Sequence, residues 1–136
     1  MHLLTDGRGN VLHIVLTRGN RNECPMLGPL LAGAVAREAR RPQRLACDKG
    51  YSADRIRSGL SALGIEPVIP MRYNEHVHDR PRFNKRAYRG RNVVERAVAK
   101  LKEFRRIATR YEKLASAYLA MLNVASIMLY LRVLDS

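Results

Sequence analysis

Two acidic residues, Asp48 and Glu95, are the side chains in this sequence whose type and placement best suit chemistry. Asp48 follows a short apolar segment, residues 44–47, that we predict to be a β-strand, and a Lys-Gly-Tyr turn comes after it. Ligands of α/β sheets bind at the carboxyl ends of strands, so a carboxylate here is well placed to hold a divalent metal ion. The alternative is an Asp that only caps the following turn, which is a common arrangement.

Glu95 belongs to a stripe of polar side chains on a predicted helix that starts at Tyr88. At 100° per residue, Arg91, Glu95 and Lys102 all fall within about 60° of Tyr88 around the helix axis. An apolar stripe runs beside them and should face the sheet; it is formed by Val94, Val98 and Leu101. The alternative is an ordinary solvated helix face on which Arg91 and Glu95 make an i,i+4 pair.

The elements that must position these residues follow from apolar periodicity and turn residues. We predict strands at 2–6, 11–17, 44–47 and 67–70, and helices at 26–40, 53–63, 88–102 (with a bend towards Arg110) and 114–131. Ser52 would cap the second helix and Gly64 would end it. The order β-β-α-β-α-β-α-α, which opens with a hairpin turned at Asp6, indicates a single α/β domain over residues 1–136. Residues 71–87 form a basic segment that we predict to be a flexible loop.

Positive charge dominates the composition and indicates a polyanionic partner. The chain has 25 Lys and Arg against 12 Asp and Glu, which gives a formal net charge of +13. Arg makes up most of the excess and suits bidentate contact with phosphate groups. Charge alone is also compatible with a generic basic surface, and it defines no mechanism.

Cysteine usage and hydropathy favour a cytoplasmic protein. Cys24 and Cys47 lie far apart without metal-ligand spacing, so we expect two free thiols in a reducing compartment. The apolar run at 114–134 could just span a bilayer, but polar residues interrupt it, and we predict a buried core helix and no membrane partner. A polar cluster at 75–79 contains metal-ligand types, although a plain loop is the favoured interpretation.

The spacing Tyr88-x2-Arg91-x3-Glu95-x6-Lys102 resembles the signature of DDE transposases of bacterial insertion sequences, the fifth family in particular. The resemblance extends over most of the chain and is weakest at 71–87; it is carried by HLLTDGRGNVLHIVLT (2–17), LACDKGYSADRIRSGLSALGIEPVIP (45–70) and the stretch 88–132. It implies a ribonuclease-H-like catalytic domain and metal-dependent DNA strand cleavage and transfer.

By this resemblance, Asp48 is the second and Glu95 the third of three acids that hold two divalent ions, Mg²⁺ or Mn²⁺. Arg91 and Lys102 would contact DNA near the cut phosphate, and Tyr88 would support the same region. Further phosphate contacts are expected from Arg105, Arg106 and Arg110, for which a solvated basic face is an equal alternative. The partner is DNA, both element ends and target, and the chain would associate with the nucleoid.

The family's first acid has no counterpart in this sequence, because that residue should lie on a central strand before the hairpin. Asp6 is no substitute, since the family has an acid at this turn as well. We therefore expect the chain to need another transposase chain or an upstream fragment, and not to act as an enzyme alone. A split reading frame, a decayed remnant and a misassigned start all fit. The alternative function is a non-catalytic fragment that binds DNA or regulates a full-length transposase.

Overall fold

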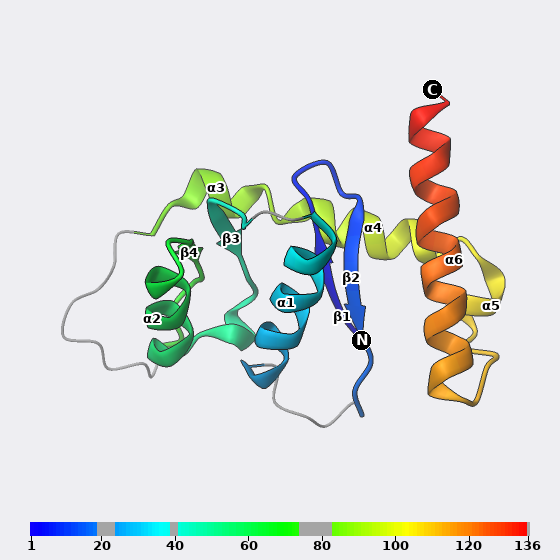
Figure 1. Cartoon of the computed structure of the whole chain (residues 1–136), viewed down its shortest axis with the longest axis horizontal. Helices are drawn as coiled ribbons and strands as arrows, with labels where there is room; N and C mark the ends of the chain where they lie inside the picture. Colours follow the sequence, from blue (N-terminus) through cyan, green and yellow to red (C-terminus); the bar gives the residue numbers. More distant parts are fainter. Residues whose placement is uncertain (19–23, 39–40, 74–82, 136) are drawn as a thin grey trace.

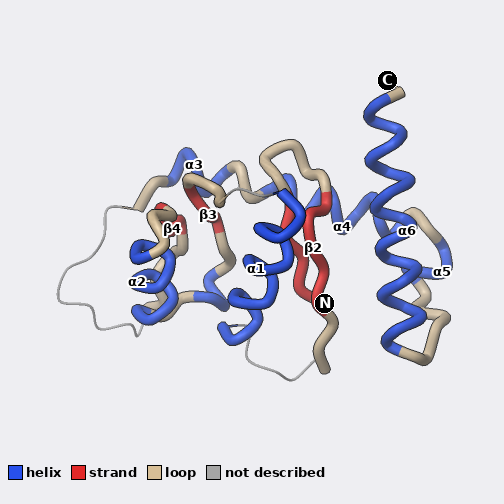
Figure 2. Tube along the Cα trace, viewed as in Figure 1, coloured by secondary structure: helices blue, strands red, loops and turns tan. Residues whose placement is uncertain are grey.

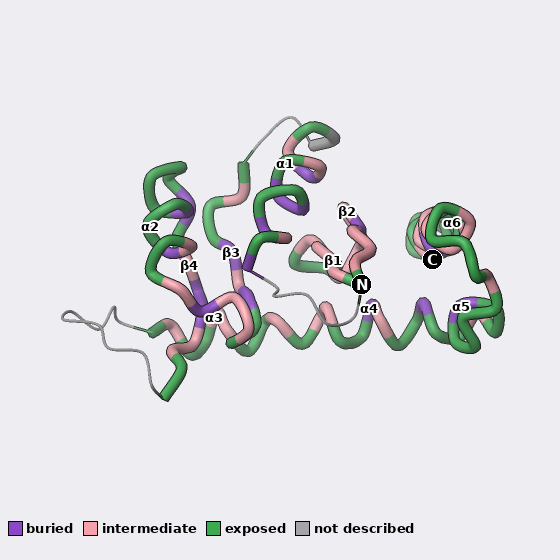
Figure 3. The backbone as a smooth tube through the Cα atoms, turned by 90° about the horizontal axis from the view of Figure 1, so that it is seen from below, coloured by how far each residue is buried: buried purple, intermediate pink, exposed green. Residues whose placement is uncertain are grey.

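The computed structural model describes residues 1–136 apart from 19–23, 39–40, 74–82 and 136. Two small sheets lie side by side between two layers of helices, with α1 and α2 on one face and α3 and α4 on the other (Figures 1 and 3). Figure 2 shows that strands make up a small part of the described chain. The mixed α/β class predicted from the sequence is confirmed, and it takes the form of two two-stranded sheets.

The first sheet is the predicted hairpin, with β1 (His2–Thr5) antiparallel to β2 (Val11–Val15). Asp6 builds its turn, because the carboxylate accepts the backbone N–H groups of Arg8 (2.8 Å) and Asn10 (2.9 Å). Gly9 adopts a φ of 92°, which a residue without Cβ reaches at low cost. Asp6 is thus committed to the turn, as the sequence predicts.

The second sheet pairs β3 (Arg44–Ala46) with β4 (Glu66–Val68) in parallel, and α2 (Asp54–Ala62) connects the two strands. Gly64 ends α2 at a φ of 73°, where the N–H of Ile65 donates to the carbonyl of Leu60 at 2.9 Å. The predicted cap is wrong, since Ala53 holds the N-cap position. Ser52 is buried and its hydroxyl accepts a 2.7 Å hydrogen bond from Arg57, which removes it from capping.

The long helix predicted from Tyr88 is divided into three shorter helices. They are α3 (Lys85–Arg89), α4 (Asn92–Lys102) and α5 (Arg105–Ala108). Bonds from residue i+3 to residue i replace the helical pattern around Gly90, and Phe104 has extended dihedrals that stop α4 before α5. The side chain of Asn84 caps α3, so the last three residues of the predicted loop 71–87 are helical. Most of that loop lies outside the described residues.

Two separate hydrophobic clusters hold the layers together. The first gathers side chains of α1 (Leu27–Glu38), which follows the short helix η1 (Cys24–Met26), together with α2 and the β3–β4 sheet. The second joins the hairpin to α4, α5 and α6 (Ala115–Leu134). Side chains alternate across a strand, and in β1 Leu4 packs against the first cluster while Leu3 packs against the second. The hairpin therefore lies at the boundary between the two clusters.

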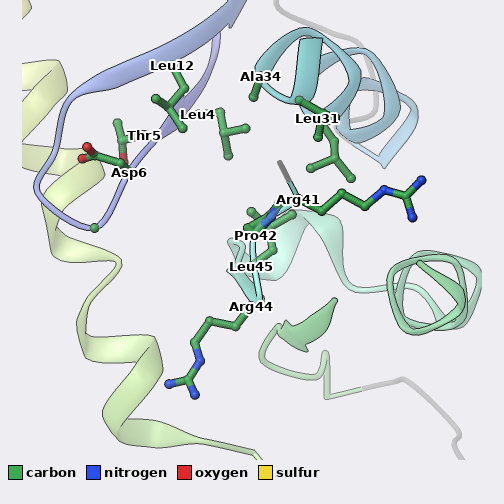
Figure 4. Close-up of a pocket in the computed structure, with 12 residues that line it drawn as sticks. Leu4, Thr5, Asp6, Leu12, Leu31, Ala34, Arg41, Pro42, Arg44 and Leu45 are labelled. Carbon is green, nitrogen blue, oxygen red and sulfur yellow. The ribbon is translucent and has the colours of Figure 1, made fainter. Parts of the chain in front are cut away.

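Two pockets occupy the space between β1 and β3, which are not hydrogen-bonded to each other. One pocket, of about 280 Å³, is lined by side chains of the hairpin, α1 and the segment leading into β3, among them Leu4, Leu31 and Leu45 (Figure 4). The other, of about 180 Å³, runs from Leu3 and Leu45 to Asp48 and Arg91. The facing edges of the two sheets are thus separated by a largely apolar gap.

The last helix differs from the buried core helix predicted at 114–131. Leu122 and Ala125 are buried in the second cluster, but many large apolar side chains of α6 are exposed. Among the described residues, α6 is the one helix that is long and apolar enough to cross a membrane. Length and composition alone are weak grounds for a membrane span, and one face of α6 packs on the rest of the chain.

The two glycines of the α2 region provide a matched test of this backbone geometry. Gly64→Ala should lower the free energy of unfolding by about 1 kcal/mol, because Ala resists a φ of 73°. Gly59→Ala should raise it by about 0.5–1 kcal/mol, since an added Cβ would meet open space within a helix. Urea denaturation measures both, and equal stabilities for the two variants would contradict the assigned end of α2.

Candidate active site

The guanidinium of Arg91 brings the two predicted catalytic acids together. Its Nη1 lies 3.1 Å from Oδ1 of Asp48, and its Nη2 donates a 2.7 Å hydrogen bond to Oε1 of Glu95. Asp48 and Glu95 stand 47 positions apart in the sequence, one just after the end of β3 and the other on α4, and these two elements lie in different layers (Figure 3). Their carboxylates therefore converge on one small volume of space.

Backbone hydrogen bonds fix the position of Asp48. The N–H of Cys47 donates to the carbonyl of Val68 at 3.2 Å, which extends the β3–β4 pairing to the residue before Asp48. The carbonyl of Asp48 then accepts the N–H of Tyr51 at 2.9 Å as the chain enters η2 (Lys49–Tyr51). The Asp48 carboxylate makes no cap hydrogen bond, so the simple turn-capping alternative does not describe this side chain.

Arg91 contacts Tyr88, which lies three residues before it in the sequence, and Glu95, which lies four residues after it. Glu95 lies in the first turn of α4, where the helix dipole favours a negative charge. The guanidinium carbon of Arg91 lies 5.4 Å from the centroid of the Tyr88 ring, within range of a cation–π interaction. The i,i+4 pair that was the alternative for Glu95 is present, and the same arginine also binds Asp48.

Solvent exposure differs between the cation and the acids. The side chain of Arg91 is 22% exposed, whereas those of Asp48 and Glu95 are 57% and 61% exposed. Ion pairs with such exposed carboxylates contribute about 0–1 kcal/mol to stability. The acids are thus held in place by the backbone and by Arg91, and their remaining oxygens are open to solvent and to a ligand.

The donor chemistry of this cluster fits a hard divalent cation in part. Carboxylate oxygens are the ligands that Mg²⁺ and Mn²⁺ prefer. Among the residues that the structure describes, no group of three acidic, histidine or cysteine side chains is close enough to hold a metal ion. The polar cluster at 75–79 lies outside the described residues. Asp48 and Glu95 supply two carboxylates, and a further ligand would have to join them.

The other predicted DNA-binding residues follow Glu95 in the sequence, at the end of α4 and in and after α5. Lys102 ends α4, about 10 Å beyond Glu95 at 1.5 Å per residue. Arg105 and Arg106 line an open pocket of about 390 Å³ beside α5. Arg106 pairs with Glu112 at 3.0 Å and stacks on Tyr111, and Arg110, at a φ of 47°, stacks on Tyr118. All four basic side chains are exposed, and they follow the Arg91 cluster along the chain.

Two contacts that support the Asp48 segment were not predicted. Arg72 donates from Nη2 to the carbonyl of Gly50 (2.8 Å) and from Nε to that of Lys49 (3.2 Å). His2 in β1 forms hydrogen bonds to the Tyr51 hydroxyl (3.0 Å) and to Thr17 (2.9 Å). Nothing in the local sequence signals these contacts, because each joins positions that are distant in the chain.

The thiol of Cys47, the residue before Asp48, is packed in the first hydrophobic cluster. Cys47 is buried, and burial raises the pKa of its thiol to about 12, with a further contribution from the negative charge of Asp48. Both cysteines are buried, and neither forms a disulfide. Cys47 therefore stays protonated near neutral pH, and we assign it a packing role within the first cluster.

Comparison with known proteins identifies relatives of this chain. Residues 1–131 match the family described as Transposase DDE domain. The chain is 35% identical over 129 residues to a Burkholderia cepacia protein named for the transposase of insertion sequence element IS402, covering 90% of this chain and 58% of the relative. It is 29% identical over 132 residues to a Brucella ovis protein named for the transposase of IS6501, covering 97% of each. No solved structure matches the chain.

The rate at which the Cys47 thiol is alkylated tests whether this residue is buried beside Asp48 and has a raised pKa. In a Cys24→Ser background, we expect iodoacetamide at pH 9 to modify the folded chain about a hundredfold more slowly than the unfolded chain, because the thiolate is the nucleophile. Asp48→Asn should speed the reaction of the folded chain, since it removes the second cause of the raised pKa. Equal rates for folded and unfolded chains would show that Cys47 is not buried as described.

Proposed function

Because this chain belongs to the family of transposase DDE domains, we propose that it contributes two carboxylates to a centre for metal-dependent DNA strand cleavage and transfer. The observation that carries the proposal is the convergence of Asp48 and Glu95 on one cationic group. The chain spans 58% of one curated relative and 97% of another, so the activity of a whole transposase is part of the proposal.

In this centre Asp48 and Glu95 would hold Mg²⁺ or Mn²⁺. Two such ions, when bound, supply charge that activates a water or 3′ hydroxyl and stabilises the leaving oxygen of the phosphodiester. The role of the chain is to fix the acids. Asp48 is held by the strand end and η2, and Glu95 by the first turn of α4.

Arg91 would act both as a placeholder and as a DNA contact. Its guanidinium lies between two carboxylates that would otherwise repel each other, and its single positive charge offsets part of their combined negative charge. A divalent cation that takes these oxygens would free the Nη atoms, and a guanidinium suits bidentate binding to a phosphate. Tyr88 would keep the arginine at the edge of the site through their stacking contact. Lys102, Arg105, Arg106 and Arg110 would bind more distant phosphates along α4 and α5.

The centre requires a third acid, which we propose comes from a strand that lies between β1 and β3. The facing edges of these strands and the two apolar pockets between them are compatible with an added strand that pairs on both sides. Such a strand would join the two sheets into one ribonuclease-H-like sheet and would end near Asp48 and Arg91, which line the same gap. An upstream fragment or another transposase chain would supply it.

Binding of Mn²⁺ tests the two carboxylates directly. Asp48→Asn combined with Glu95→Gln should weaken Mn²⁺ binding by about tenfold or more, because two of its anionic oxygen ligands are removed. The decrease of the free Mn²⁺ signal in electron paramagnetic resonance measures binding without any enzymatic readout.

Glu66→Gln is the matched control for this experiment. Glu66 is 47% exposed and pairs with Arg44 at 3.4 Å, so it is also an arginine-bound surface acid. Unchanged binding in the double variant, or an equal loss in Glu66→Gln, would overturn the metal assignment. With the third acid supplied, nicking of supercoiled plasmid should require Mg²⁺ or Mn²⁺ and should be abolished in Asp48→Asn and in Glu95→Gln.

A second candidate function is a non-catalytic fragment that binds DNA or regulates a complete transposase. It is favoured by the cluster of exposed basic side chains on α4 and α5, whose charge does not depend on the acids. Either function places the chain on DNA, at the nucleoid of a bacterial cytoplasm. The chain would be this fragment if the wild-type chain binds DNA but does not cut it after the third acid is supplied, and if Glu95→Gln leaves DNA binding unchanged.

Three arginines in and directly after α5 should determine how DNA binding responds to salt. Replacing Arg105, Arg106 and Arg110 by Ala should weaken binding to a short duplex, and the slope of log K against log salt should fall by about 0.9 for each phosphate that the variant no longer binds. Fluorescence anisotropy between low and high salt measures both quantities. A control with Arg41, Arg44 and Arg55 replaced by Ala removes the same charge from exposed sites in and next to β3 and α2, which lie across the molecule from α5 (Figure 1). Equal changes in the two triple variants would indicate a non-local effect of charge.

A further inference from the structure

Tyr111, which follows α5, is a large aromatic side chain that the fold leaves in solvent. It is 69% exposed, although an aromatic ring usually contributes to stability through burial. The guanidinium carbon of Arg106 lies 5.1 Å from the ring centroid, within range of a cation–π interaction. Glu112 holds Arg106 in this position, because its Oε1 accepts a 3.0 Å hydrogen bond from Nη2 of the arginine. One face of the ring is thus covered by a fixed cation, and the exposed fraction shows that the other face is open.

The backbone next to Tyr111 fixes the position of this ring. Arg110 has a φ of 47° and is, within the described part of the chain, the one residue other than glycine with a positive φ. The N–H of Arg110 donates to the carbonyl of Ile107, and the N–H of Tyr111 donates to that of Arg106, both at 3.2 Å. These two bonds form a Schellman motif, in which the residue at the position of Tyr111 often makes an apolar contact with the helix. Tyr111 contacts a guanidinium instead and stays in solvent.

An open pocket of about 390 Å³ lies beside this ring and is lined by Arg105, Arg106, Thr109 and Tyr111. The hydroxyl of Thr109 already donates to the carbonyl of Arg105 at 2.9 Å. A ligand in the pocket would therefore meet chiefly two guanidinium groups and one aromatic ring. α5 follows the end of α4, and the first turn of α4 carries Glu95 (Figure 1). A DNA strand that runs along α4 from the candidate active site would reach this pocket.

We propose that the pocket holds an unpaired base of a DNA strand, stacked on Tyr111, while Arg105 and Arg106 bind the adjoining phosphates. Sites for single-stranded nucleic acids combine aromatic rings, on which bases stack, with cationic groups that follow the backbone. A base inside a duplex is stacked on its neighbours and must leave the helix to use such a ring. The choice of DNA as the ligand rests on the proposed function, whereas the stacking site rests on the residues of the pocket.

The combination of a ring and two cations favours a nucleotide over other anions. A free phosphate or a carboxylate side chain would bind to Arg105 and Arg106, but it has no flat face for Tyr111 to contact. A duplex offers phosphates to the same arginines while its bases remain stacked inside the helix. An unpaired nucleotide supplies a flat base and a phosphate together, so it matches both parts of the pocket.

Fluorescence anisotropy with two single strands tests the site. The strands are a short oligothymidine and a strand of the same length and charge that lacks all bases, and both are measured in EDTA. Tyr111→Ala should weaken binding of the whole chain to oligothymidine about tenfold, because one stacked base is lost. It should leave binding to the abasic strand unchanged, which also shows that the variant is folded. Tyr111→Phe retains an aromatic ring and should bind both strands like the wild-type chain.

Tyr73→Ala is the matched control. Tyr73 is a fully exposed tyrosine that follows β4, across the molecule from α5 (Figure 1), and its loss should change neither affinity. The proposal would be overturned by an equal loss of Tyr111→Ala on both strands, by an equal loss in Tyr111→Phe or Tyr73→Ala, or by a wild-type chain that does not prefer oligothymidine to the abasic strand.

The stacking site and the metal centre can fail separately. The binding assay contains no metal ion, and the variant that combines Asp48→Asn with Glu95→Gln should show the same tenfold effect of Tyr111→Ala on oligothymidine. Loss of Mn²⁺ binding in that variant is measured without DNA. A chain that binds Mn²⁺ through Asp48 and Glu95 but gains nothing from Tyr111 would therefore keep the proposed function and lose the stacking site.

Discussion

The contact of Arg91 with Asp48 and Glu95 is the interaction on which the candidate active site depends. The carboxylates of Asp48 and Glu95 lie 3.1 Å and 2.7 Å from the Nη atoms of Arg91, and two such anions would repel each other without a cation between them. Arg91 lies at the junction of α3 and α4, where bonds from residue i+3 to residue i replace regular helical hydrogen bonds. The break around Gly90 therefore lies directly beside the residue that joins the two acids.

Local signals in the sequence predict much of the fold. The hairpin and its Asp6 turn, the short strand before Asp48, and the glycine that ends α2 all follow from residues within a few positions of each other. The sequence does not predict the division of the long helix or the role of Ser52. The hydroxyl of Ser52 instead accepts a hydrogen bond from Arg57, and the helix is divided by i+3-to-i bonds around Gly90 and by the extended dihedrals of Phe104; residue type alone signals neither.

The candidate site is predicted less completely than the fold. Spacing along a helix places Arg91 and Glu95 together, since i,i+4 neighbours share a face, but it gives no information about Asp48. The family resemblance indicates that Asp48 belongs with Glu95, and the structure supplies the contact through Arg91. Arg72 and His2 could not be predicted, because they stabilise the Asp48 segment from positions more than 20 residues away.

Because the core is divided into two clusters, a movement of one cluster relative to the other would change the distance between Asp48 and Glu95. Asp48 follows a strand of the first cluster, whereas Glu95 lies on a helix whose Leu101 is buried in the second. A small shift of one cluster relative to the other would separate the acids while both clusters remained folded. The local opening free energy at the site can then be smaller than that of global unfolding, and amide hydrogen exchange near Asp48 would be faster than in the centre of either cluster.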